Sequence, residues 1–79
     1  RTSGKPQVAI AVLDTFIQNY PESVDLDRAQ YTQALIRMED LHDHATALQE
    51  FQQFLIDHPR SMYLEQARRK ARILTNRVS

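Results

Sequence analysis

The sequence predicts an all-α protein of about four helices packed as antiparallel hairpins, and three observations support this fold class. The 79-residue chain contains one glycine and no cysteine. This composition favours helices joined by short turns over folds built from β-hairpins or held by disulfide bonds. Apolar residues recur at helical spacing. Residues 8–29 and 46–67 also align at a constant offset of 38 residues. An internal repeat of this length is typical of a helical solenoid, whose units bury their apolar faces on one another.

Identical residues mark the repeat at six pairs of positions. Conservative pairs such as Leu13 and Phe51 fill the gaps between them. We therefore expect a single domain over residues 1–79, built from two related units. The identical pairs are Ala9 and Ala47, Phe16 and Phe54, Pro21 and Pro59, Ser23 and Ser61, Leu26 and Leu64, and Ala29 and Ala67.

Prolines are expected to end the first and third helices. Pro21 and Pro59 each follow a stretch of periodic apolar residues, and a proline forces the residue before it out of helical geometry. The two helices should therefore end near Asn19 and Asp57.

Polar residues are expected to cap the N-termini of the second, third and fourth helices. Ser23 and Ser61 lie two residues after each proline and can cap the next helix through their hydroxyl groups. Asp43 is the best N-cap for the third helix. The sequence therefore predicts helices near residues 6–19, 24–40, 44–57 and 62–77.

Small and aromatic residues in the repeat follow a recognisable order. The pattern A-x3-F-x2-F-x4-P begins at Ala47, and the first copy, A-x3-L-x2-F-x4-P, begins at Ala9. The helix between them contains Y-x2-A-L-x2-M from Tyr31. This arrangement resembles the tetratricopeptide repeat (TPR) over about residues 7–77. Leu35 and His42 stand where that family usually has glycine.

The resemblance implies helical hairpins that form part of a right-handed α-solenoid, and a role as a scaffold that binds a protein or peptide partner. The Tyr20-Pro21-x-Ser23 style of linker is similar to repeats of bacterial envelope proteins, of the outer-membrane assembly lipoprotein and Tol-Pal coordinator types. That similarity implies a location in the periplasm or cell envelope.

The last helix has a polar face where the second helix is apolar. A solenoid must end in a helix whose outer face is compatible with water, so we interpret the last helix as a C-terminal cap. The equivalents of Tyr31, Ala34 and Met38 in the last helix are Arg69, Arg72 and Asn76.

The first helix is apolar around most of its circumference, which indicates neighbours on more than one side. Two explanations remain open. The chain is the C-terminal part of a longer repeat array, or another copy covers the face around Ala9, Leu13 and Phe16 in a homo-oligomer.

Charge is distributed unevenly although the net charge is zero. Residues 1–61 carry five basic and nine acidic residues, whereas residues 62–79 carry five basic residues and one acidic residue. The basic end either solubilises the last helix or binds an acidic peptide, a phospholipid surface or nucleic acid. Nucleic acid is disfavoured, because no aromatic side chains alternate with the arginines. By analogy with TPR proteins, the residues expected to face a partner are Gln33, Arg37, Lys70 and Arg77.

Catalysis, cofactors and metals find little support in the sequence. The carboxylates, Glu50 among them, are expected on turns or outward faces, and no glycine-rich phosphate loop is present. His42 and His44 form a His-x-His pair without a third fixed ligand, and His58 is expected to cap a helix end. No apolar run approaches the roughly 20 residues of a transmembrane helix.

A third function remains open beside the protein-binding scaffold and the homo-oligomer. The chain could be a regulatory tail on an enzyme encoded upstream.

Overall fold

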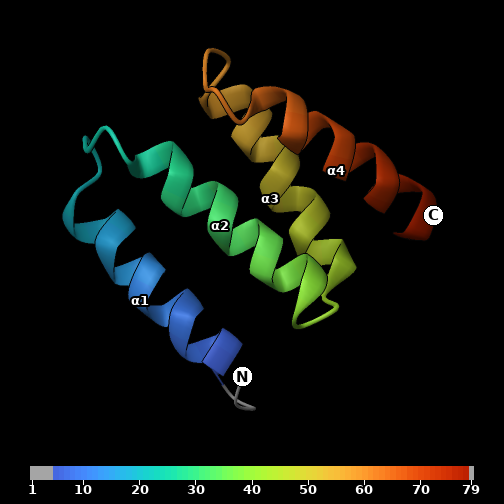
Figure 1. The fold of residues 1–79 in the computed structure, drawn as a ribbon, viewed down its shortest axis with the longest axis horizontal. Helices are drawn as coiled ribbons and strands as arrows, with labels where there is room; N and C mark the ends of the chain where they lie inside the picture. The colour runs from blue at the N-terminus through green and yellow to red at the C-terminus, as the bar shows by residue number, and fades with distance from the viewer. Residues whose placement is uncertain (1–4, 79) are drawn as a thin grey trace.

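The computed structural model describes residues 5–78, which form four α-helices and no strand (Figure 1). Each helix packs on the next along the chain as a series of hairpins, so the predicted all-α fold is confirmed. Residues 1–4 and 79, the ends of the predicted domain, lie outside the described residues. The helices are α1 (Lys5–Asn19), α2 (Leu26–Glu39), α3 (His44–Asp57) and α4 (Leu64–Val78).

The helix ends near the prolines match the prediction. Helix α1 ends at Asn19 and α3 ends at Asp57, each two residues before a proline. Asp43 is the N-cap of α3, and its Oδ1 accepts a hydrogen bond of 3.4 Å from the backbone N–H of Thr46.

The starts of α2 and α4 lie two residues later than predicted, at Leu26 and Leu64. The hydroxyl oxygen of Ser23 accepts a bond from the N–H of Asp25 (3.1 Å), and Ser61 accepts the equivalent bond from Tyr63 (3.0 Å). Each serine therefore closes a turn that precedes the helix, instead of capping the helix itself.

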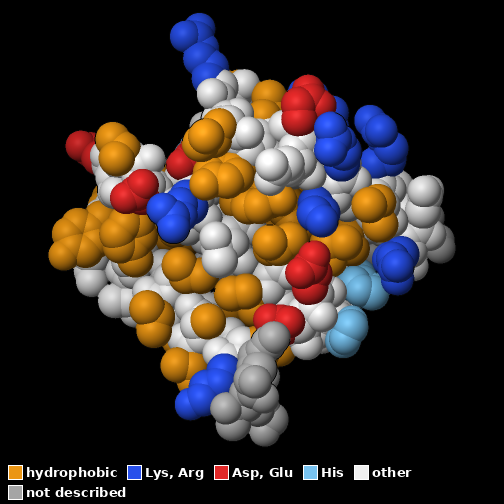
Figure 2. Space-filling model, viewed as in Figure 1, with side chains coloured by type: hydrophobic (Ala, Val, Ile, Leu, Met, Phe, Trp, Pro, Cys, Tyr) orange, Lys and Arg blue, Asp and Glu red, His pale blue; other side chains and the backbone are white. Residues whose placement is uncertain are grey.

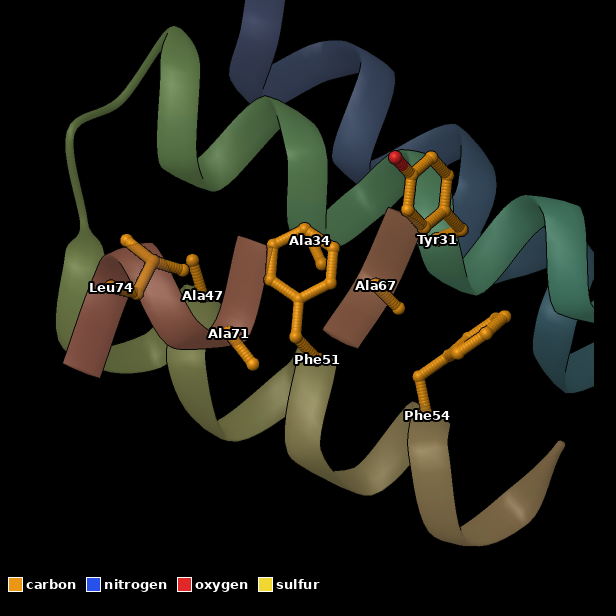
Figure 3. Close-up of a cluster of buried hydrophobic side chains, with 8 residues drawn as sticks. All are labelled: Tyr31, Ala34, Ala47, Phe51, Phe54, Ala67, Ala71 and Leu74. Atoms are coloured by element: carbon orange, nitrogen blue, oxygen red, sulfur yellow. The ribbon is translucent and has the colours of Figure 1, made fainter. Parts of the chain in front are cut away.

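The hydrophobic core lies where α2, α3 and α4 meet (Figure 3). The Phe51 side chain is completely buried, and Tyr31 from α2 packs against it with ring centroids 5.7 Å apart. Small residues allow the helices to approach closely around these rings. The core side chains are Tyr31, Ala34, Ala47, Phe51, Phe54, Ala67, Ala71 and Leu74.

Helix α1 lies at one edge of the molecule and packs on α2 (Figure 1). It has no buried residue. The Gln33 side chain of α2 joins the two helices, because its amide Nε2 donates a hydrogen bond of 3.1 Å to the carbonyl oxygen of Ile10. The first unit of the repeat is therefore much less buried than the second.

Candidate protein-interaction surfaces

A hollow of about 320 Å³ lies between α2 and α4. Figure 2, viewed as in Figure 1, shows hydrophobic side chains gathered between these helices and Lys and Arg side chains grouped over α4. We call this hollow the α2/α4 groove. Its lining residues are Tyr31, Gln66, Arg69, Lys70 and Ile73.

Tyr31 provides a rigid wall for the α2/α4 groove. Its ring stacks on Tyr63 with centroids 5.1 Å apart and an interplanar angle of 17°, and only 7% of the residue is exposed. Burial raises the pKa of the Tyr31 hydroxyl, and the nearby Glu39 carboxylate raises it further. The hydroxyl therefore stays protonated near neutral pH and can donate a hydrogen bond.

Lys70 supplies the positive charge at the edge of this groove. Its Nζ lies 3.8 Å from Glu39 Oε2, and both side chains are partly exposed. An ion pair this long and this accessible contributes little stability, so Lys70 can exchange Glu39 for a carboxylate on a partner. Arg77 is exposed two helical turns further along α4, on the face that Lys70 occupies.

The structure separates the other two predicted partner-binding residues from Lys70. Gln33 is only 8% exposed, and its amide binds α1. Arg37 Nε lies 2.9 Å from Oε2 of Glu50 on α3. Both residues therefore lie on the side of α2 that faces α1 and α3, and the predicted set does not form one continuous surface. A role for either residue in partner binding stays a prediction.

The predicted oligomer face on α1 is partly covered by α2. Ala9, Leu13 and Phe16 are all partly buried, and the last two line a hollow with Ala29 of α2. Val8 and Val12 are more accessible, at 57% and 63% exposure. The open apolar surface of α1 is therefore centred on these valines instead of the three predicted residues.

The sequence interpretation missed the environment of Glu50. This side chain was expected on an outward face, but it is half-buried, and its Oε1 is buried without a hydrogen-bond partner among the described residues. Burial raises the pKa of Glu50, whereas Arg37 lowers it. The spacing could have predicted this burial, because Glu50 lies three residues after Ala47 and four before Phe54, and both of these residues are buried.

The three histidines contact neighbouring side chains or lie at a helix end. The rings of His42 and His44 meet edge to face, with their centroids 6.1 Å apart. Residues 5–78 contain no group of three His, Cys, Asp or Glu residues that could hold a metal ion. His58 is the C-cap of α3, and its Nε2 hydrogen-bonds to Gln30 Oε1, a contact that the sequence did not suggest.

These hairpins and their shared core define a TPR-like helical-repeat protein. The chain belongs to the YfiO family of outer membrane lipoproteins, which matches residues 2–79. The resemblance to envelope lipoproteins is thus confirmed, and the family places the chain in the cell envelope. Comparisons with curated proteins and with solved structures gave no match. None of the helices in the described part of the chain has the length and apolar character needed to cross a membrane.

Proposed function

We propose that this chain is a protein-interaction module that binds an acidic segment of a partner protein in the α2/α4 groove. The observation that carries the proposal is the combination of Ile73, an apolar residue 44% exposed, with Lys70 and Arg69 in one hollow. The matching partner segment presents an apolar side chain next to carboxylates. Membership of the YfiO family supports an interaction role.

Two physical terms favour such a segment. Covering the exposed part of Ile73 contributes about 25 cal/mol for each Å² of apolar surface removed from water. The basic residues of α4 attract an acidic segment during its approach and select against basic ones. Apolar contact therefore supplies affinity, and charge supplies selectivity.

A binding role fits the two groups with shifted pKa values better than catalysis does. Tyr31 lines the α2/α4 groove, whereas Glu50 lines a separate hollow between α2 and α3. General acid and base groups must both reach one reacting molecule, and these two residues do not share a hollow.

The proposal is tested by selecting random displayed peptides on the immobilised chain and measuring the affinity of the selected sequences. We expect acidic peptides with an apolar anchor, and a loss of at least about tenfold in affinity for the K70E/R77E variant, equivalent to about 1.4 kcal/mol. The charge-matched control is R68E/R72E, which alters exposed residues on another face of α4. Equal losses in both variants, or none in either, would contradict the proposal.

A second candidate function is self-association through α1, which the exposure of Val8 and Val12 favours. Pairing two such faces would remove apolar surface from water in both copies. Sedimentation equilibrium should then show a dimer that Val12→Glu dissociates, whereas Gln18→Glu, at an exposed position about 120° around α1 from Val12, leaves it intact. A monomer at all concentrations would exclude this candidate.

A further inference from the structure

A second hollow, which shares one wall with the buried core, lies between α2 and α3. It encloses about 160 Å³ and has no lining residue in common with the α2/α4 groove. We call it the α2/α3 pocket. Its lining residues are Gln30, Gln33, Glu50, Gln53, Phe54 and Asp57.

The hydrogen bonds around this pocket leave two amide oxygens free as acceptors, whereas the Oε1 of Gln30 is bonded to His58. The amide Nε2 of Gln33 donates to the backbone of Ile10 (3.1 Å), and that of Gln53 donates to Asp57 Oδ1 (3.0 Å). The carbonyl oxygens of these two amides have no protein donor among the described residues. Gln33 is itself more than nine-tenths buried, so its amide is held in place at the pocket.

The carboxylates make the pocket negative. Glu50 Oε2 binds Arg37, but its Oε1 is buried without a donor among the residues described. Asp57 adds a second carboxylate at the exposed rim. The lining therefore contains two carboxylates and no cationic side chain, Arg37 being paired with one of them from outside the pocket. A buried acceptor without a donor is costly. A cationic donor that entered the pocket and reached Oε1 of Glu50 would balance the negative charge and supply the missing hydrogen bond.

The aromatic wall and the acceptors of the pocket favour a planar cation. Phe54 forms one wall and is only 2% exposed, so its ring is fixed by the core. A guanidinium group stacks on aromatic rings, offers five donors in one plane, and loses its hydration more readily than an ammonium group. The pocket offers acceptors from Glu50, Gln33 and Gln53.

We propose that the α2/α3 pocket binds an arginine side chain of a partner protein. The guanidinium lies against Phe54, donates to Glu50 Oε1 and to the amide oxygens of Gln33 and Gln53, and is balanced by Asp57 at the rim. The proposal shares with the proposed function only the premise that the partner is a protein, and it uses a different surface.

The test is a titration of the ¹⁵N-labelled chain with N-acetyl-L-arginine methylamide, followed by NMR. We expect saturable shifts at the side-chain amides of Gln33 and Gln53, with a Kd on the order of millimolar for one isolated side chain. The norleucine analogue, which lacks the charge, should cause no saturable shifts there. The lysine analogue should bind at least about threefold more weakly.

Two variants distinguish binding in the α2/α3 pocket from a general effect of the protein's carboxylates on a cationic ligand. Asp57→Asn, at an exposed position, should weaken arginine binding at least about threefold without disturbing the core. The matched control is Glu39→Gln, an exposed residue beside the α2/α4 groove, which should leave the Kd unchanged.

Equal binding of the arginine and norleucine analogues, lysine binding as tight as arginine, or equal Kd values for both variants would overturn the proposal. None of these results depends on a peptide binding in the α2/α4 groove, so the two proposals fail separately.

Discussion

His42 adopts a backbone conformation that is unfavourable for a residue with a side chain. Its φ angle is +55°, and it is the one non-glycine residue with positive φ in the described part of the chain. The turn around it is closed by bonds from Leu41 N–H to Ile36 (3.1 Å) and from Asp43 N–H to Arg37 (2.8 Å). A side chain with a Cβ atom is disfavoured in this left-handed region, by about 1–2 kcal/mol.

Replacing His42 by glycine should therefore stabilise the protein. We expect His42→Gly to raise the free energy of unfolding by about 0.5–1 kcal/mol, because the relief of strain exceeds the extra chain entropy of glycine. Urea unfolding measures the change. His42→Ala is the control, since it removes the imidazole but keeps the Cβ atom. A similar gain in both variants would show that the ring, and not the backbone, carries the strain.

Glu50 should make stability depend on pH. Burial raises the pKa of its carboxyl group, Asp43 and Asp14 raise it further, and Arg37 opposes them. Because the folded pKa lies above the unfolded value, ionised Glu50 costs stability above the folded pKa, and the cost disappears as the pH falls toward the ordinary value of 4.5. Glu50→Gln should therefore unfold at a higher urea concentration than the natural chain at pH 7 but not at pH 4.

The partner of Glu50 supplies the control for this experiment. Arg37→Gln leaves the carboxylate without its cation and should lower stability at pH 7 by roughly 1 kcal/mol. Protonation of Glu50 removes most of that loss at pH 4. A Glu50→Gln variant that is less stable than the natural chain at pH 7 would mean that the Arg37 pair outweighs the cost of burial.

At the scale of elements, a side-chain bond ties the turn before α4 to the start of α2. The Ser61 hydroxyl donates to Asp27 Oδ2 at 2.6 Å, while its oxygen also accepts from Tyr63 N–H. Ser23, the equivalent residue of the first unit, makes the turn bond to Asp25 and has no such acidic partner among the described contacts. The two serines therefore offer a matched comparison within one chain.

Ser61→Ala should cost more than Ser23→Ala. The first change removes a bond to a carboxylate as well as the turn bond, and we expect a loss of about 1–2 kcal/mol against about 0.5–1 kcal/mol. Thermal or urea unfolding of the two variants gives the comparison. Equal losses would show that the Asp27 bond contributes no net stability.

Helix boundaries show what the sequence could and could not predict about the elements. The prolines and Asp43 act within a few residues of the backbone they control, so the ends of α1 and α3 and the start of α3 were predicted correctly. The starts of α2 and α4 were placed two residues too early, at residues 24 and 62. Ser23 and Ser61 were expected to be N-caps, but a serine that closes a turn and one that caps a helix have the same local pattern.

At the scale of the whole molecule, the predicted binding residues were split between two surfaces. Gln33 follows Tyr31 by two residues and is therefore turned roughly 200° around α2, toward α1 instead of α4. The sequence pattern shows which residues share a helix face, but not which neighbouring helix covers that face. The α2/α3 pocket was missed for the same reason, since it joins residues far apart in the chain.

The charge asymmetry also belongs to the whole molecule. Residues 62–79 carry a net charge of +4 and residues 1–61 a net charge of −4. Lys70 and Arg69 bring part of this positive charge to the α2/α4 groove, while Glu50 and Asp57 make the α2/α3 pocket negative. The molecule thus presents surfaces of opposite charge, suited to acidic and basic groups of protein partners.

NMR mapping of a selected acidic peptide on the ¹⁵N-labelled chain tests the proposed function most directly. We expect small shifts at Val8 and Val12, and the largest shifts at the backbone amides of the residues that line the α2/α4 groove, which are Tyr31, Gln66, Arg69, Lys70 and Ile73. Shifts concentrated on α1, or spread evenly over the four helices, would contradict a binding role for this groove.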